Sequence, residues 1–170
     1  YIEWGIKAFE MFKGMFVFVI HDNRNEEKVF IVRDKLGIKP LYYQENNNSL
    51  LICSEITPLT KLIGNKSINK EFLNDYLLFN YPLKTSNCLI DSIKILEPAT
   101  FIEITEKKID KIKYWSIKYN RSGITLNDFD EIFQETIRKH LIADTSIAST
   151  LSSGIDSSII SYLSNKHAKN

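Results

Sequence analysis

Short apolar runs alternate with polar turns through the first 115 residues, a pattern typical of an antiparallel sheet. The run Met-Phe-Val-Phe-Val-Ile at 15–20 is β-branched and aromatic, as in a strand that is buried on both faces. Turn formers separate it from the next run and indicate a hairpin, and a polar turn at 46–48 indicates another. The predicted strands cover residues 15–20, 28–33, 41–43, 50–53, 100–105 and 109–115.

Two helices are expected between these strands. The first covers residues 55–63 and ends at Gly64, because glycine commonly follows the last turn of a helix. Ser67 or Asn69 can cap the second helix, and Pro82 lies just beyond its end. Its apolar residues share one helical face: Phe72, Leu73, Tyr76 and Leu77.

The pattern changes at residues 118–126, a polar break without apolar periodicity, where we place a domain boundary. Beyond it, Asn127 is the expected N-cap of a helix, with Asp130 three residues later. The apolar face of this helix comprises Phe129, Ile132, Phe133, Thr136, Ile137, His140 and Leu141, so His140 is expected to be a core histidine.

A strand is predicted at 146–151, followed by a hydroxyl-rich turn at 152–158. A second helical stretch carries Ile159, Ile160 and Leu163. The order helix, strand, polar turn, helix is how an α/β nucleotide-binding unit begins.

Composition narrows the class of protein. With 44% hydrophobic and 25% charged residues, the chain has the composition of a soluble globular protein. A net charge of +1, with lysines interspersed among acids, gives no footprint for nucleic acid. No apolar run approaches the ~20 residues that span a bilayer, so we expect no membrane partner and an intracellular protein. Cys53 and Cys88 are too few and too far apart for a zinc cluster, and reduced thiols are expected.

The turn at 152–158 carries the candidate chemistry. The first backbone N–H groups of a helix lack intrahelical acceptors, and the helix dipole places positive charge there, so an anion is favoured. Gly154 would let the backbone approach closely, while Ser152, Ser157 and Ser158 would add donors for phosphate oxygens. Asp156 would either contact a metal bound to that phosphate or hold the turn together.

Two alternatives for this turn stay open. An ordinary capped turn would use the same residue types, and no Gly-Lys-Ser/Thr ends the segment as in a P-loop. A serine hydrolase built on Ser157 is a weaker alternative, because the Gly-x-Ser-x-Gly frame is absent.

The segment Leu151-Ser152-Ser153-Gly154-Ile155-Asp156-Ser157-Ser158 resembles the Ser-Gly-Gly-x-Asp-Ser pyrophosphate loop of the ATP pyrophosphatase superfamily. The similarity is greatest to glutamine-hydrolysing asparagine synthetases, which also have a His-Leu-x-x-Asp segment like 140–144 before the loop. Upstream segments resemble, in the same order, the glutaminase domain of class II amidotransferases. These segments are 14–22, 33–43, 54–56, 96–99 and 114–115.

The resemblance implies the domain organisation and the fold. Residues 1–118 would be the C-terminal part of an α+β glutaminase domain, an incomplete antiparallel sandwich of the N-terminal-nucleophile type. Residues 119–126 would be a linker, and 127–170 would start an α/β ATP pyrophosphatase (synthetase) domain. The family's nucleophilic cysteine and its glutamine-binding residues would lie upstream, so neither Cys53 nor Cys88 is the expected nucleophile and this segment alone should be inactive.

The resemblance also implies a reaction. Glutamine would supply ammonia, ATP would convert a carboxylate acceptor, aspartate above all, into an acyl-adenylate, and ammonia would attack it. ATP and Mg²⁺ would be the cofactors, the location cytoplasmic, and a homodimer is expected. Leu151 would lie near the adenine, and Asp156 would contact Mg²⁺ through the pyrophosphate. By this resemblance, the residues expected to bind the pyrophosphate are Ser152, Gly154, Ile155, Asp156, Ser157 and Ser158.

One departure from the family pattern keeps an alternative open. Ser153 replaces the first of the paired glycines, which would cost backbone freedom if φ had to be positive. The alternative is a catalytically degenerate nucleotide-binding or regulatory homologue. Arg33 and Asp34 are interpreted as residues that fix their hairpin by hydrogen bonding and not as catalysts.

Overall fold

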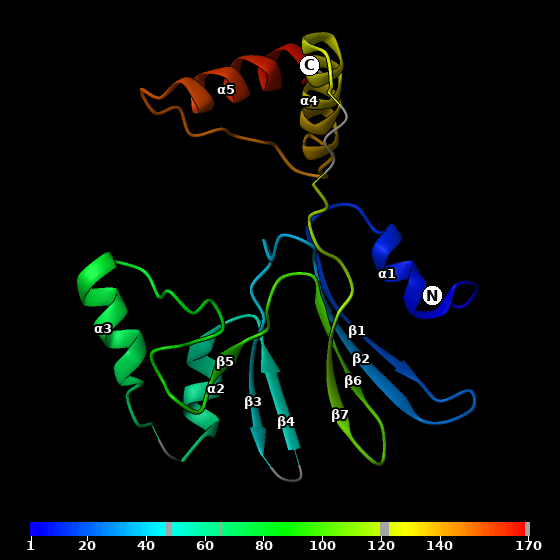
Figure 1. Cartoon of the computed structure of the whole chain (residues 1–170), viewed down its shortest axis with the longest axis vertical. Coiled ribbons are helices and arrows are strands. Elements are labelled where there is room, and N and C mark those ends of the chain that lie inside the picture. Colours follow the sequence, from blue (N-terminus) through cyan, green and yellow to red (C-terminus); the bar gives the residue numbers. More distant parts are fainter. Residues whose placement is uncertain (47–48, 65, 120–122, 169–170) are drawn as a thin grey trace. The chain divides into compact units, whose positions relative to one another are not determined.

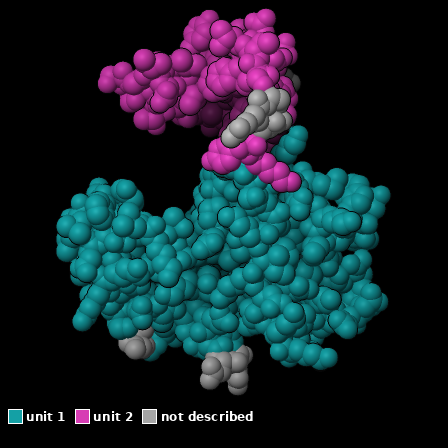
Figure 2. Space-filling model, in the orientation of Figure 1, with its two compact units in different colours: residues 1–117 teal, residues 118–170 magenta. Residues whose placement is uncertain are grey.

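The computed structural model describes residues 1–46, 49–64, 66–119 and 123–168. The chain divides into two compact units, Tyr1–Ile117 and Lys118–Asn170 (Figure 2). Residues 47 and 48 of the predicted turn, and residues 120–122 of the predicted linker, lie outside the described residues.

The described residues of unit 1 form two antiparallel sheets (Figure 1). The first has the order β1-β2-β6-β7 and the second β4-β3-β5. The strands are β1 (Val17–Asp22), β2 (Lys28–Arg33), β3 (Tyr42–Asn46), β4 (Ser49–Cys53), β5 (Lys94–Ile95), β6 (Thr100–Ile104) and β7 (Ile109–Lys113). The helices are a 3-10 turn (Gly5–Lys7), α1 (Ala8–Met11), α2 (Ile56–Leu62) and α3 (Lys70–Phe79).

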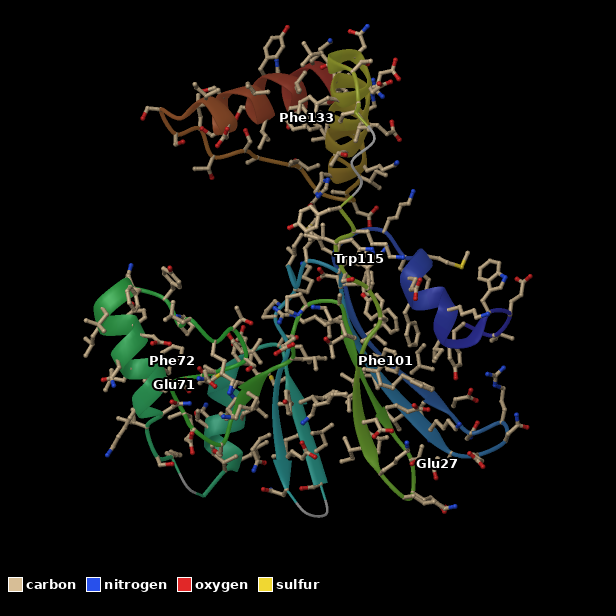
Figure 3. All side chains as sticks on the ribbon, in the orientation of Figure 1. Glu27, Glu71, Phe72, Phe101, Trp115 and Phe133 are labelled. Atoms are coloured by element: carbon tan, nitrogen blue, oxygen red, sulfur yellow. The ribbon has the colours of Figure 1, made fainter. Side chains whose placement is uncertain are left out.

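Strand β2 is buried on both faces, as its uninterrupted apolar sequence requires. Phe30 and Val32 point into an aromatic cluster with Phe9 of α1 and Phe101 of β6, the latter 1% exposed (Figure 3). Ile31 points the other way and packs in a cluster that includes residues of the second sheet. That shared cluster makes the two sheets a sandwich, and α1 covers the outer face of the first sheet.

The second sheet is covered in turn by α2. Leu59 and Ile63 form a third cluster with Cys88 and Ile93, and Cys53 packs against it. Both cysteines are free thiols, and burial raises the pKa of Cys88 to about 11. Unit 1 is therefore an α+β arrangement of antiparallel sheets, which confirms the predicted class of the N-terminal part.

Helix α3 begins as predicted from one of its two candidate caps. The Asn69 side chain accepts a hydrogen bond from the Phe72 N–H at 3.0 Å. The helix ends at Asn80, which adopts a left-handed conformation with φ 64°. Its predicted apolar face buries no residue completely, and Tyr76 and Leu77 are exposed.

The described part of unit 2 contains two helices, α4 (Leu126–His140) and α5 (Ile155–His167). The prediction of Asn127 as the N-cap of α4 is wrong, because the cap lies two residues earlier. Thr125 is the cap, because its backbone is extended and its Oγ accepts from the Asp128 N–H at 3.1 Å. The Asp128 carboxylate accepts from the Thr125 N–H at 2.8 Å, which completes a capping box that the sequence pattern did not distinguish.

Two further expectations for unit 2 are wrong. Residues 146–151 form no strand, because a strand needs a paired neighbour and the described residues of unit 2 contain none. His140 is exposed and not in a core; its Nδ1 lies 2.9 Å from the Thr136 carbonyl oxygen. Among the described residues, no helix has the length and hydropathy that crossing a bilayer requires.

Candidate functional site

The predicted anion-binding turn lies at the start of α5. Gly154 is its N-cap, and the Ser158 N–H makes the first intrahelical hydrogen bond, to the Gly154 carbonyl at 3.2 Å. The N–H groups of Ile155, Asp156 and Ser157 precede that bond and therefore have no acceptor within the helix. Their dipoles add at this end, so the local field favours a negative ligand.

The serine hydroxyls, expected as donors to phosphate, bond to the loop itself in this structure. The Oγ atoms of Ser152 and Ser157 lie 2.7 Å apart, and the Gly154 N–H donates to Ser152 Oγ at 3.3 Å. Ser157 Oγ also lies 3.1 Å from each of two carbonyl oxygens, those of Ser152 and Gly154. Ser158 Oγ donates to the Gly154 carbonyl at 2.8 Å. A phosphate would therefore bind to the free N–H groups first, and the hydroxyls would have to rotate to join them.

The backbone of this loop is not strained. Gly154 has φ −81°, a value open to any residue, so positive φ is not the reason for glycine at this position. A Cβ atom at Gly154 would lie 3.4 Å from Ser152 Oγ, an ordinary van der Waals contact, so steric crowding does not demand glycine here either. Ser153 is not among the described residues with positive φ. Replacing a family glycine by Ser153 thus carries no backbone cost in this conformation.

The remaining predicted residues point outward. Leu151 and Ile155 are 68% and 76% exposed, and the Asp156 side chain is exposed as well. Within the part of the chain that the structure describes, no cluster of three or more histidine, cysteine, aspartate or glutamate residues could hold a metal ion. One exposed carboxylate suits Mg²⁺ only if phosphate oxygens and water complete the coordination, which is the usual arrangement for this ion.

A cavity of unit 2 is separate from this loop. A hollow of about 810 Å³ lies between the end of α4, the segment 141–149 and the later turns of α5. Arg138, Ser149, Ser161 and His167 are among its lining residues, whereas none of residues 151–158 lines it. This cavity therefore does not include the loop, most of whose residues are exposed.

In unit 1 the Arg33–Asp34 pair holds a turn. The Arg33 guanidinium donates to the carbonyl oxygens of Lys39 (2.7 Å), Gly37 (2.6 Å) and Leu96. The Asp34 carboxylate accepts from the N–H groups of three residues of the same turn, Leu36, Ile38 and Lys39, at 3.0–3.1 Å. Both side chains are engaged in this way with backbone groups, so the predicted structural role is confirmed.

The sequence did not indicate one further member of this network, the Tyr114 hydroxyl. It donates to the Arg33 carbonyl at 2.8 Å, and burial raises the Tyr114 pKa to about 12. Tyr114 directly follows the last strand, and a tyrosine buried there is expected to find a hydrogen-bond partner for its hydroxyl. That position was the sequence feature from which this contact could have been predicted.

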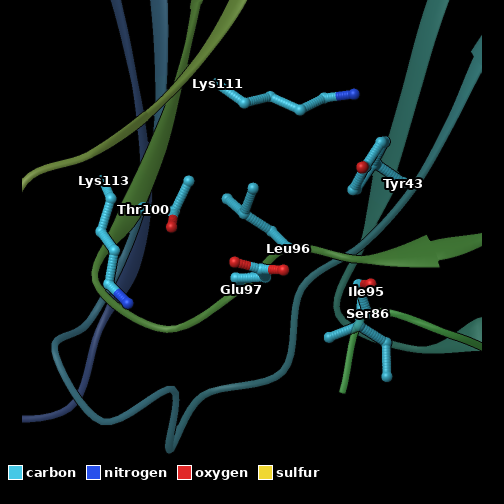
Figure 4. Close-up of a pocket in the computed structure, with 8 residues that line it drawn as sticks. All are labelled: Tyr43, Ser86, Ile95, Leu96, Glu97, Thr100, Lys111 and Lys113. Atoms are coloured by element: carbon cyan, nitrogen blue, oxygen red, sulfur yellow. The ribbon is translucent and has the colours of Figure 1, made fainter. Parts of the chain in front are cut away.

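A small cavity of about 260 Å³ lies where the two sheets diverge (Figure 4). Lys111 of β7 bridges the sheets there: its Nζ lies 2.7 Å from Glu45 and 4.8 Å from the centre of the Tyr43 ring. The lining residues are Tyr43, Ser86, Ile95, Leu96, Glu97, Thr100, Lys111 and Lys113. The cavity's charged lining residues are Glu97, Lys111 and Lys113.

Two protein families match consecutive parts of the chain. Residues 1–115 match the glutamine amidotransferase domain, and residues 128–170 match asparagine synthase. The chain belongs to the glutamine-hydrolysing asparagine synthetase family. The predicted resemblance is thereby confirmed over nearly the whole chain.

Three relatives from Bacillus subtilis show what share of a family member's length this chain covers. Glutamine-hydrolyzing asparagine synthetase 3 is 24% identical, over 98% of this chain and 28% of its own length. Asparagine synthetases 1 and 2 are 30% and 31% identical, over 94% and 95% of the chain and 26% and 24% of their own lengths. The chain thus spans about a quarter of the length of these family members.

Proposed function

We propose that the protein forms an amide from a carboxylate, with glutamine as the nitrogen source and ATP as the activating reagent. The observation that carries the proposal is the order of the two family matches on one chain, a glutaminase-type domain followed by a synthetase-type segment. Such an order couples ammonia release to amide formation within one polypeptide. Aspartate is the proposed acceptor, because the matched relatives bear the name of asparagine synthetases.

The proposed chemistry gives the loop before α5 a role. A carboxylate is a poor electrophile until one of its oxygens becomes part of a leaving group, and adenylation by ATP provides this with release of pyrophosphate. The free N–H groups of Ile155, Asp156 and Ser157 would hold the departing negative charge, with the hydroxyls of Ser152 and Ser158 and the close backbone at Gly154 beside them. Asp156 would hold Mg²⁺ through the pyrophosphate, and Leu151 would lie near the adenine.

The domain assignment follows from the same proposal. Residues 1–118 would belong to the glutaminase, 119–126 to the linker and 127–170 to the synthetase, and the two compact units and the two family matches support this division. A biosynthetic ligase that consumes ATP and glutamine would work in the cytoplasm, where both are abundant.

The reaction products test the proposed function. Incubated with glutamine, aspartate, ATP and Mg²⁺, the full-length enzyme that contains this segment should release AMP and pyrophosphate together with glutamate and asparagine. Formation of ADP and phosphate would contradict adenylation. Equal rates with and without glutamine, when no ammonia is added, would contradict the glutaminase assignment.

Nucleotide binding tests the loop itself. In calorimetric titration with Mg-ATP, Asp156→Ala and Ser157→Ala should each weaken binding about ten-fold or more, the usual cost of a lost charge-assisted contact. Asp130→Ala is the matched control, since Asp130 is exposed on α4 and its carboxylate contacts Gln134. Unchanged affinity in both loop variants would remove the loop from the nucleotide site.

The second candidate function is a degenerate nucleotide-binding or regulatory homologue. It is favoured by the serine hydroxyls that are already bonded within the loop, whereas Ser153, whose backbone is unstrained, could act only through its side chain. This candidate predicts Mg-ATP binding without turnover, and recovery of AMP formation in Ser153→Gly would show that the serine is the cause.

A further inference from the structure

Two serine pairs join the start of α5 to the chain that leads into it. Ser152 Oγ lies 2.7 Å from Ser157 Oγ, and Ser149 Oγ lies 2.8 Å from Ser161 Oγ. Ser157 and Ser161 are four residues apart in α5 and therefore share one face of the helix. The chain before the loop thus runs back along that face and is tied to it at two points. Both pairs lie within the continuous segment 149–161, so these bonds need no other part of the protein.

The two pairs differ in their distance from the expected phosphate. The Ser152–Ser157 pair belongs to the loop at 152–158, where the Gly154 N–H also donates to Ser152 Oγ. Ser161 lies one helical turn farther from the free N–H groups, about 6 Å along the helix axis. An anion at the start of the helix would therefore meet the first pair and not the second.

Phosphate binding would break the first pair. Each serine hydroxyl has one proton to donate, and Ser157 Oγ is engaged with Ser152 and with loop carbonyl oxygens. To donate to a phosphate oxygen, the hydroxyls of Ser152 and Ser157 must turn away from each other. The Ser149–Ser161 pair needs no such change, because either of its hydroxyls can keep donating to the other.

We propose that Ser149 and Ser161 are positioning residues for the loop at 152–158. Their hydrogen bond holds the incoming chain against α5 while the hydroxyls of Ser152 and Ser157 turn to the phosphate. The inference rests on the proposed function and adds to its nucleotide site two residues that do not contact the ligand. Without this bond the loop has to be ordered when the nucleotide binds, and that cost lowers the affinity.

Binding and kinetics of the full-length enzyme that contains this segment test the pair. Ser149→Ala and Ser161→Ala should each raise the Kd and the KM of Mg-ATP about three- to ten-fold, the usual effect of one neutral hydrogen bond. The kcat should stay within about two-fold, because the bond is present in the ground state and the transition state alike. Ser149→Thr keeps the hydroxyl and should retain the native affinity. The double alanine variant should lose no more than one single variant, since either substitution breaks the same bond.

Ser146→Ala is the matched control, because Ser146 is exposed in the same segment and lines the same cavity as Ser149 and Ser161. It should leave the KM of Mg-ATP unchanged. Glutamine hydrolysis, the activity proposed for the glutaminase domain, should be unchanged in every variant and monitors the folding of unit 1.

Three results would overturn the pairing while leaving the proposed function intact. They are native affinity in both alanine variants, additive losses in the double variant, and a Ser149→Thr enzyme as weak as Ser149→Ala. A native enzyme that binds no Mg-ATP would instead overturn the proposed function, and this inference with it.

Discussion

At the scale of single residues, Gly37 shows the strictest steric demand in unit 1. Its φ is +64°, and a Cβ atom there would lie 2.8 Å from Pro98 Cγ and 3.1 Å from Arg33 Cζ. Backbone strain and overpacking would act together, so Gly37→Ala should lower the free energy of unfolding by about 2 to 4 kcal/mol. Urea denaturation measures the change.

Gly64→Ala is the control for this prediction. Gly64 has no neighbour within 4 Å of the built Cβ position, and its φ is not in the left-handed region. Its substitution should leave the free energy of unfolding almost unchanged. Equal effects at positions 37 and 64 would contradict a steric cause.

Asp34 should make the stability of unit 1 depend on acid. Burial raises the pKa of its carboxyl, but hydrogen bonds from the backbone N–H groups of Lys39, Ile38 and Leu36 outweigh burial, and the net pKa lies below the ordinary 3.8. A pKa lowered by folding contributes stability above the unfolded pKa, and this contribution is lost as pH falls through the folded pKa.

We therefore expect Asp34→Asn to destabilise the chain at pH 7, because an amide cannot accept the same set of bonds. The difference between the native chain and this variant should shrink below about pH 4, where the unfolded carboxyl is protonated. Thermal unfolding across about pH 2–7 measures it. A difference that grows as the pH falls would show that the carboxylate is not the stabilising form.

At the scale of elements, the sequence predicted most of the strands of unit 1. Apolar runs of this length between turn formers are too short for helices and are typical of strands. It did not predict β5, because the pairing of two residues with β3 depends on the fold and not on local pattern. It predicted a strand at 146–151 that the structure lacks, since an apolar run does not reveal whether a pairing partner exists.

The candidate site was predictable to a similar degree. The residue types at 152–158 indicated a hydroxyl-rich helix start, and the structure brings Ser152, Gly154 and Ser157 together there. The sequence could not reveal that these hydroxyls bond to one another and to loop carbonyls. The direction of a serine hydroxyl depends on the acceptors around it in the folded loop. The order of residue types does not specify that direction.

The capping box of α4 gives a prediction at this scale. Thr125→Ala removes the acceptor of the Asp128 N–H and should destabilise unit 2 by about 1 kcal/mol, the usual value for a lost N-cap. Circular dichroism during thermal unfolding measures the loss of helix. Thr136→Ala is the matched control: Thr136 lies within α4 and its hydroxyl bonds the Ile132 carbonyl. A larger loss in the control would contradict the capping role of Thr125.

At the scale of the whole molecule, the two units differ in how much apolar surface they bury. The structure describes three buried clusters in unit 1, which together include side chains from both sheets and from α1 and α2. In the described part of unit 2, only Ile137 and Leu163 are buried hydrophobic residues. Five large apolar side chains in the described residues of α4 and α5 are at least half exposed: Leu126, Phe129, Ile132, Ile155 and Tyr162.

This contrast predicts how the amide protons of the 170-residue chain exchange with solvent. Helices of 15 and 13 residues are marginal in water without tertiary packing, so α4 and α5 should open often. Strands β2 and β6 should open only with the global unfolding of unit 1, because their side chains lie in its clusters. Hydrogen-exchange mass spectrometry should find the amides of residues 126–140 exchanging at least about a hundred-fold faster than those of 28–33. Equal protection of both segments would mean that unit 2 gains stability from burial that its two apolar core residues do not provide.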